Sequence, residues 1–200
     1  MGRSFKSNYR DGDTFSRKAK IEGYRSRSAF KLKELQNKDR LIKRGMSILD
    51  LGSFPGGWSQ VSKEIVGEKG KIVGVDLQEM KPIQGTSFIH KSVIELKAED
   101  FDANLIPFDI VLSDMAPNIS GIQDRDNAQM IDLLDKVIYS IENFLKTGGS
   151  TIIKVFQGDS LEYAKRFIKE HFLEIKIRKP DSSRRNSSET YILGINLKEK

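Results

Sequence analysis

A glycine-rich segment between an apolar run and a helical pattern offers a binding site for a nucleoside. The apolar run, residues 48–51, is short enough to be a buried strand. Gly52, Pro55, Gly56 and Gly57 interrupt it, and helical spacing begins at Trp58. Glycines let main-chain amides approach a ligand closely, and a helix N-terminus adds the positive end of its dipole. The pattern is therefore typical of a nucleotide-binding crossover.

An acidic residue refines the kind of ligand expected. The next apolar run, residues 71–75, ends at Asp76, 24 positions after Gly52. A carboxylate there can accept both ribose hydroxyls of a nucleoside. The pyrophosphate fingerprint G-x-G-x-x-G needs its second glycine where this chain has Phe54. A nucleoside without a pyrophosphate fits better, with S-adenosylmethionine the common example, and a nicotinamide oxidoreductase is disfavoured.

Two lysines and two acids stand at positions that could carry chemistry. Asp114 follows the fourth expected strand, Lys154 lies near the end of the fifth, Glu189 begins the last, and Lys31 lies in a basic N-terminal helix. Ligands of parallel sheets bind outside the carboxyl ends of the strands. Taken singly, each residue has a plainer interpretation as a turn former, an edge lysine or a solvated strand end. A lysine within an apolar strand is nevertheless costly to bury unless a carboxylate meets it.

The elements that must position these side chains alternate along the chain. Strands are expected at residues 48–51, 71–75, 86–90, 108–113, 150–156, 175–177 and 189–195. Helices are expected near residues 29–35, 58–66, 130–145 and 161–168, with 119–127 as a polar loop and Gly148-Gly149 closing the third helix. This order predicts an α/β fold with a mostly parallel sheet and helices on both faces. The last two strands, which have no helix between them, could form an antiparallel edge.

Composition limits the classes of protein. Two hundred residues with 38% apolar content predict one domain, residues 24–200, after a basic, flexible segment of residues 1–23. No run of 18 apolar residues, no secretory signal and no cysteine are present, which favours a cytoplasmic protein, with a mitochondrial one as a minor alternative. With only His90 and His171, we expect no metal site.

The positive charge is concentrated at the N-terminus. The net charge is +6, and residues 1–33 contain ten Lys or Arg against three acids. Aromatic residues are interleaved with them, namely Phe5, Tyr9, Phe15, Tyr24 and Phe30. Such a segment is typical of a nucleic-acid contact, although a solvated tail is the alternative. Residues 1–20 show no periodicity, so we expect no regular structure there without a partner.

Several segments together resemble a known family. They are Arg25-Ser-Arg-Ser-Ala-Phe-Lys-Leu, Asp50-Leu-Gly-Ser-Phe-Pro-Gly-Gly-Trp-Ser-Gln, Val75-Asp76, Ser113-Asp-Met-Ala-Pro-Asn, Ile153-Lys-Val-Phe and Ser187-Ser-Glu-Thr-Tyr. From about residue 24 to 194 the chain resembles the RrmJ/FtsJ family of RNA ribose 2′-O-methyltransferases. The resemblance implies a Rossmann-like class I methyltransferase fold with a seven-stranded sheet, and S-adenosylmethionine as cofactor.

The resemblance also assigns roles to residues. It implies a catalytic tetrad of Lys31, Asp114, Lys154 and Glu189. The cofactor-binding positions are Asp50, Gly52, Pro55, Gly56, Gly57, Trp58, Asp76, Leu77, Ser92 and Asp114. Ser92 is a departure, because family members often have an acid there, near the adenine. Arg25, Arg27, Lys31, Arg184 and Arg185 are expected to contact RNA.

The expected reaction is S-adenosylmethionine-dependent 2′-O-methylation of a uridine in large-subunit ribosomal RNA, by a monomer acting on the RNA or the ribosomal particle. Because the sulfonium already activates the methyl group, no metal is required. Lys154 would accept the proton of the ribose hydroxyl or orient that hydroxyl. The alternatives are methylation of a tRNA anticodon loop, or a non-catalytic RNA-binding protein of the same fold.

Overall fold

The computed structural model describes residues 14–118, 120–183 and 187–199. One sheet contains β1 (Ser47–Leu51), β2 (Lys71–Asp76), β3 (Ser87–His90), β4 (Phe108–Ser113), β5 (Leu145–Phe156), β6 (Phe172–Arg178) and β7 (Glu189–Leu197). The helices are α2 (Ser28–Asp39), α3 (Gly57–Val66), α4 (Gln123–Phe144) and α5 (Asp159–His171), with short 3₁₀ turns at Val93–Glu95 and Ala98–Asp100. Residues 14–21 are also helical.

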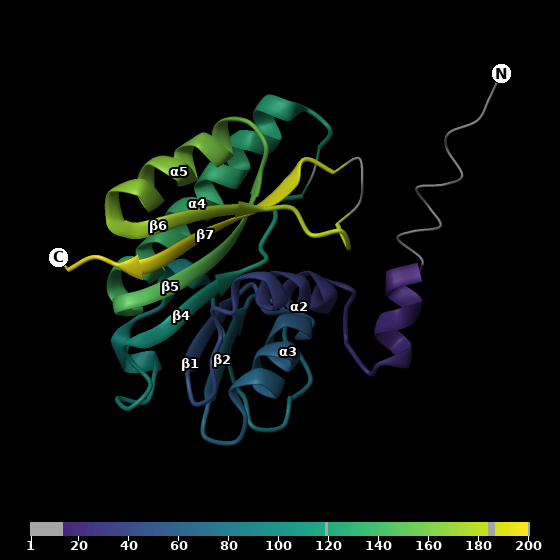
Figure 1. The fold of residues 1–200 in the computed structure, drawn as a ribbon, viewed down its shortest axis with the longest axis vertical. Coiled ribbons are helices and arrows are strands. Elements are labelled where there is room, and N and C mark those ends of the chain that lie inside the picture. The colour runs from purple at the N-terminus through teal and green to yellow at the C-terminus, as the bar shows by residue number, and fades with distance from the viewer. Residues whose placement is uncertain (1–13, 119, 184–186, 200) are drawn as a thin grey trace.

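The strand order is β3-β2-β1-β4-β5-β7-β6 (Figure 1). The first five positions pair in parallel, whereas β7 runs antiparallel to both β5 and β6. The predicted seven-stranded, mostly parallel fold with an antiparallel edge is confirmed. The sheet reverses at β7 because the chain returns from β6 through a loop without a crossover helix.

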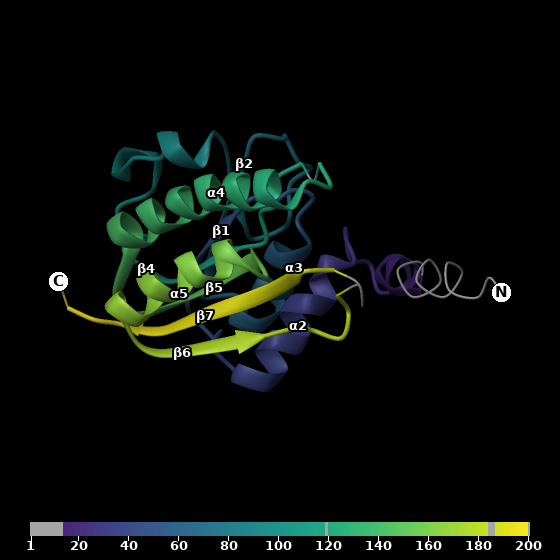
Figure 2. The same cartoon turned by 90° about the horizontal axis from the view of Figure 1, so that it is seen from above.

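Helices α4 and α5 cover one face of the sheet and α2 and α3 cover the other (Figure 2), and each face has its own apolar core. On one face α4 and α5 pack through Leu134 and Ile168. On the other, α2 and α3 pack through Leu32 and Val61. The inner strands β1, β2, β4, β5 and β7 are buried from both sides, as the continuous apolar runs of the sequence predict, whereas the edge strands β3 and β6 are partly exposed.

Helix α4 begins at Gln123, so the prediction of a polar loop through residue 127 is wrong in its second half. The side chain of Asp126 accepts hydrogen bonds from the main-chain N–H groups of Ser120 and Gly121 and from the Ser120 hydroxyl. The acids of the first turn also suit the helix dipole. The polar residues from Gln123 to Asn127 thus form the first turns of the helix and not a loop.

The end of α4 also differs from the prediction. The helix stops at Phe144, and Leu145 is extended and pairs with Phe108 on β4. Gly148 and Gly149 therefore lie within β5 and do not close the helix. The register with β4 shifts before pairing resumes at Ser150, which is the strand start that the sequence predicts. Strand β6 is likewise longer than the predicted residues 175–177.

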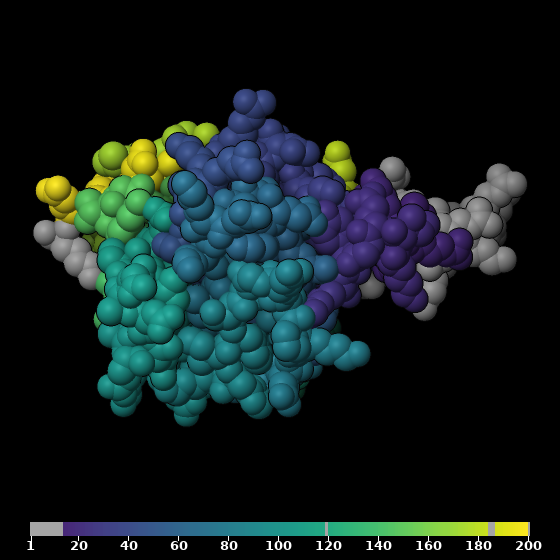
Figure 3. All heavy atoms as spheres, turned by 90° about the horizontal axis from the view of Figure 1, so that it is seen from below, coloured from purple at the N-terminus to yellow at the C-terminus, as the bar shows by residue number. Residues whose placement is uncertain are grey.

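The described aromatic residues of the basic segment pack against the core. Phe30 and Tyr24 are buried, with ring centroids 5.8 Å apart, and Phe15 lies 5.7 Å from Phe30. Lys18 and Lys33 lie over these rings. Residues 14–21 are thus an ordered helix docked through Ala19 and Phe15, against the expectation of no regular structure there. They form the purple end of the surface in Figure 3. Phe5 and Tyr9 lie outside the described residues.

Within the described parts of the chain, every helix is too short or too polar to cross a membrane.

The two-sided core predicts a clear contrast between two leucines. Leu134 on α4 is fully buried, whereas Leu173 on β6 is 70% exposed. We expect Leu134→Ala to lower the free energy of unfolding by about 2–5 kcal/mol, because it leaves a cavity. Leu173→Ala, the same chemical change, should stay within about 0.5 kcal/mol of the wild type. Urea unfolding of both variants measures this, and equal losses would contradict the assigned core.

Candidate active site

Lys154 and Asp114 form a shielded pair at the carboxyl end of the parallel strands. Asp114 directly follows β4, and Lys154 lies on neighbouring β5. The Lys154 ammonium donates to the main-chain oxygen of Asp114 at 2.6 Å and to its Oδ1 at 3.1 Å. The side chains are 9% and 16% exposed. The carboxylate explains how an apolar strand accommodates a lysine.

Lys31 and Glu189 form a second pair beside the first. Lys31, a buried residue of α2, places its Nζ 2.6 Å from Glu189 Oε1. The hydroxyl of Ser183 also donates to Glu189 Oε1, at 2.9 Å. Burial acts to raise the pKa of Glu189, but the charges of Lys31 and Lys154 and these hydrogen bonds outweigh it and hold that pKa below its usual value. Glu189 is therefore an anion at neutral pH.

Tyr191 joins the two pairs, and the sequence analysis missed it. Its hydroxyl donates to Asp114 Oδ1 at 2.7 Å and lies 3.3 Å from Glu189 Oε1. Burial, reinforced by the two carboxylates, raises the pKa of Tyr191 well above its usual value, so the phenol keeps its proton. The sequence could have indicated Tyr191, because residues two apart on a strand share a face and Tyr191 lies two residues after Glu189. The four predicted catalytic side chains are thus brought together.

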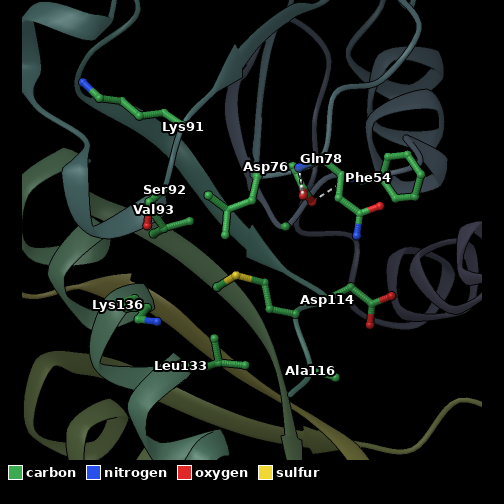
Figure 4. A pocket seen from close by; sticks show the side chains of 13 residues that line it. Phe54, Asp76, Gln78, Lys91, Ser92, Val93, Asp114, Ala116, Leu133 and Lys136 are labelled. Atoms are coloured by element: carbon green, nitrogen blue, oxygen red, sulfur yellow. Dashed lines mark hydrogen bonds between the residues drawn. The ribbon is translucent and has the colours of Figure 1, made fainter. Parts of the chain in front are cut away.

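A pocket of about 300 Å³ opens next to this cluster (Figure 4). Its lining residues follow the ends of β1, β2, β3 and β4 or come from α4: Gly52, Phe54, Asp76, Leu77, Gln78, Lys91, Ser92, Val93, Asp114, Met115, Ala116, Leu133 and Lys136. Five of the predicted cofactor positions are among them, namely Gly52, Asp76, Leu77, Ser92 and Asp114. The sequence analysis missed the apolar walls, because Val93, Met115 and Leu133 lie far apart in the chain.

Asp76 and Gly52 shape one side of this pocket. The Asp76 carboxylate accepts the main-chain N–H of Phe54 at 2.9 Å and that of Gln78 at 2.8 Å. Each carboxylate oxygen retains a further lone pair that a ribose hydroxyl can use. Gly52 has a φ of 69°, and a Cβ there would lie 2.2 Å from Met115 Cγ. Only glycine lets Met115 form that wall.

The other five predicted cofactor residues do not line this pocket. Asp50 is buried beneath the loop and accepts the Ser59 hydroxyl at 2.6 Å. Pro55, Gly56, Gly57 and Trp58 contact the segment of residues 25–28 instead.

The predicted RNA-contacting residues are placed unequally. The guanidinium of Arg25 donates to main-chain oxygens of residues 55, 81 and 82. Arg27 is the N-cap residue of α2, one turn before Lys31. Arg184 and Arg185 lie outside the described residues. Within the described residues, no cluster of three His, Cys, Asp or Glu side chains could hold a metal ion.

The sequence of the chain matches a family model described as FtsJ-like methyltransferase over residues 24–197. The chain belongs to the FtsJ-like methyltransferase family. The resemblance stated from the motifs is confirmed, and with it the methyltransferase activity.

Named relatives of this FtsJ-like methyltransferase agree with one another. The ribosomal RNA large subunit methyltransferase E of Xanthomonas campestris pv. campestris is 43% identical over 185 residues, 91% of this chain and 88% of the relative. That of Methylobacillus flagellatus is 41% identical over 186 residues, covering 92% and 90%.

Solved structures share the fold of this FtsJ-like methyltransferase. A Plasmodium falciparum protein assigned as a ribosomal RNA methyltransferase superposes with a TM-score of 0.76 at 31% identity, covering 88% of this chain and all of that one. Fibrillarin from Aeropyrum pernix, solved with S-adenosyl-L-methionine natively bound, superposes with a TM-score of 0.62 at 19% identity, covering 84% and 76%. The latter likeness concerns the fold alone.

Asp50 makes the stability of this FtsJ-like methyltransferase depend on pH. Complete burial, aided by the charges of Asp114 and Asp76 and opposed by the Ser59 hydrogen bond, raises the pKa of Asp50 from 3.8 to about 7. Between these two values the folded state holds a proton that the unfolded state has lost. The contribution of Asp50 to stability is therefore complete below pH 3.8 and is lost as pH rises to about 7.

We expect Asp50→Asn to remove this dependence. As the pH rises from 3.8 to about 7, the wild type should lose up to about 1.4 kcal/mol of unfolding free energy per pH unit relative to the variant. Above about pH 7 the difference should stay constant. Urea unfolding of both proteins at about pH 5, 6, 7 and 8 tests this. A difference that stays constant across that range would show that Asp50 does not titrate there.

Proposed function

We propose that this chain transfers a methyl group from S-adenosylmethionine to the 2′-hydroxyl of a uridine in large-subunit ribosomal RNA, acting as a monomer. The observation that carries the proposal is the double role of Asp114. It lines the nucleoside-sized pocket and also accepts a hydrogen bond from Lys154 in the lysine–carboxylate cluster. Cofactor site and reaction site therefore meet at one side chain.

The pocket suits the nucleoside of this cofactor. Asp76 offers lone pairs to two ribose hydroxyls, and Ser92 offers a hydroxyl near the apolar walls of Val93 and Leu133. Phe54 occupies the place of the glycine that a pyrophosphate would need. When bound, the cofactor supplies a methyl group already activated by a sulfonium.

The lysine–carboxylate cluster suits the nucleophile. Nζ of Lys154 makes two contacts with Asp114, which leave one further tetrahedral position of the nitrogen for the ribose hydroxyl. At that position Lys154 can orient the hydroxyl or accept its proton. Tyr191 fixes Asp114, and the Lys31–Glu189 pair borders the cluster. Alignment of the reacting atoms accounts for much of the rate that enzymes gain.

The choice of RNA rests on the relatives. Those named ribosomal RNA large subunit methyltransferase E match this chain at 38–43% identity over more than nine-tenths of its length. We carry their substrate over to this chain, with the RNA lying across the N-terminal helix, Arg27 and Lys31. Methylation of large-subunit particles and of tRNA with labelled cofactor, followed by mapping of the modified nucleotide, tests the choice.

Replacing Lys154 should lower the methylation rate without lowering the affinity for the cofactor. We expect Lys154→Ala to lower the methylation rate by about 10²–10⁴-fold, the usual contribution of a group that acts on a reacting proton or hydroxyl. Cofactor affinity, measured by calorimetry, should be unchanged, since Lys154 does not line the pocket. Lys169→Ala, an exposed lysine on α5, is the control. A Lys154→Ala rate above about a tenth of wild type would exclude an essential role.

The RNA path can be tested through its salt dependence. The triple substitution Arg17→Gln, Lys20→Gln and Arg27→Gln removes three cations from the N-terminal segment. Each lost phosphate contact should reduce the salt slope of RNA affinity by about 0.7–0.9. Neutralising Lys165, Arg166 and Lys169 on α5 in the same way gives a control of equal charge. Equal slopes for the two variants would place the RNA elsewhere.

A further inference from the structure

The two glycines that end the cofactor loop are shaped by the N-terminal segment of residues 25–28. A Cβ on Gly57 would lie 2.3 Å from the Ser26 hydroxyl and 3.2 Å from that of Ser28. A Cβ on Gly56, whose φ is 113°, would lie 2.6 Å from Cδ1 of Ile83, in the loop after β2, and 3.2 Å from Cδ of Arg25. The segment thus packs against the loop at residues that do not line the pocket.

Arg25 connects this segment to two loops at once. One guanidinium nitrogen lies 3.4 Å from the main-chain oxygen of Pro55 and 2.5 Å from that of Lys81, and the other lies 2.7 Å from that of Pro82. Residue 55 belongs to the loop after β1, whereas residues 81 and 82 belong to the loop after β2. The forked guanidinium can bridge several fixed oxygens, which a lysine ammonium on one stem cannot do in the same geometry.

The side chain of Gln60, in the first turn of α3, binds main-chain atoms of Arg25 and Gly23. Its Oε1 accepts the Arg25 N–H at 2.8 Å, and its Nε2 donates to the Gly23 oxygen at 3.0 Å. Close by, the Trp58 indole donates to the Ser28 oxygen at 2.9 Å. These contacts fix the Arg25 main chain, so its side chain reaches the two loops from a set position.

Both loops held by Arg25 continue into the pocket wall. Phe54, directly before Pro55, lines the pocket and donates its N–H to Asp76. Leu77 and Gln78, a few residues before Lys81, line it too. The Asp76 carboxylate holds the two loops together from inside the pocket, and the Arg25 guanidinium holds them from outside.

We propose that Arg25 is a positioning residue for the cofactor, a clamp that sets the separation of the loops after β1 and β2, and that it is not an RNA contact. The proposal rests on the assignment of this pocket to S-adenosylmethionine. It also gives the basic N-terminal segment a second role, because the chain that leads to Lys31 then supports the cofactor pocket as well.

The test compares Arg25→Ala, Arg25→Lys and Gln60→Ala with the control Arg166→Ala, an arginine on α5 across the sheet. We expect Arg25→Ala to raise the dissociation constant and the KM for S-adenosylmethionine by about tenfold, the size of losing one charged hydrogen bond. Its kcat at saturating cofactor should stay near wild type, since the catalytic cluster is untouched. Arg25→Lys should recover only part of the affinity, and Gln60→Ala should weaken it in the same direction.

Two outcomes would contradict the proposal. If Arg25→Ala binds S-adenosylmethionine like the wild type but shows a flatter salt slope for RNA, Arg25 is an RNA contact and the proposal is wrong. If only the melting temperature falls, its role is merely structural and the proposal is equally wrong. Should Arg25→Ala fail to fold, calorimetry of S-adenosylmethionine binding to Arg25→Lys and Gln60→Ala decides.

A wild-type protein that binds no S-adenosylmethionine would instead refute the proposed function, so the failure of the Arg25 proposal and the failure of the proposed function are distinguishable.

Discussion

Two ammonium groups buried next to two carboxylates are the constraint on which the site depends. Removing an unpaired charge from water is far too costly for a domain of ordinary stability, so each lysine must meet its acid. Lys31 meets Glu189 and Lys154 meets Asp114, with the Tyr191 hydroxyl between the two acids. The cluster holds its members in place because a displaced member would leave a buried charge without a partner.

The topology of the sheet makes this cluster possible. Asp114 and Lys154 lie on neighbouring parallel strands, whereas Glu189 and Tyr191 arrive on β7, which runs in the opposite direction beside β5. The antiparallel pairing sets Lys154 opposite Tyr191 in register. A parallel strand there would bring its C-terminal residues to this edge, and Glu189, the first residue of β7, would lie at the far end of the sheet. The single reversed strand is therefore needed for the charged cluster as well as for the core.

The pocket and the charged cluster share structural supports and are not separate parts of the molecule. Asp114 belongs to both the pocket and the charged cluster, and α2 contributes Lys31 while its preceding turn packs on the glycine loop. The glycines of that loop have two different reasons for being glycine. Gly52 leaves room for Met115 inside the pocket, whereas Gly56 leaves room for Ile83 and Arg25, and Gly57 for Ser26, outside it.

Alternating apolar runs and local motifs were enough to predict the fold and the family, and to single out the two lysines and two acids that the folded chain brings together, because they encode the strand ends and the residues directly after them. Which residues meet across long separations became clear only in the folded chain. Folding added Tyr191 to the cluster, kept Pro55 to Trp58 out of the pocket wall, and placed Tyr24 and Phe30 inside a core. Residue type and spacing specify a local conformation, whereas burial and partners depend on contacts between segments distant in the chain.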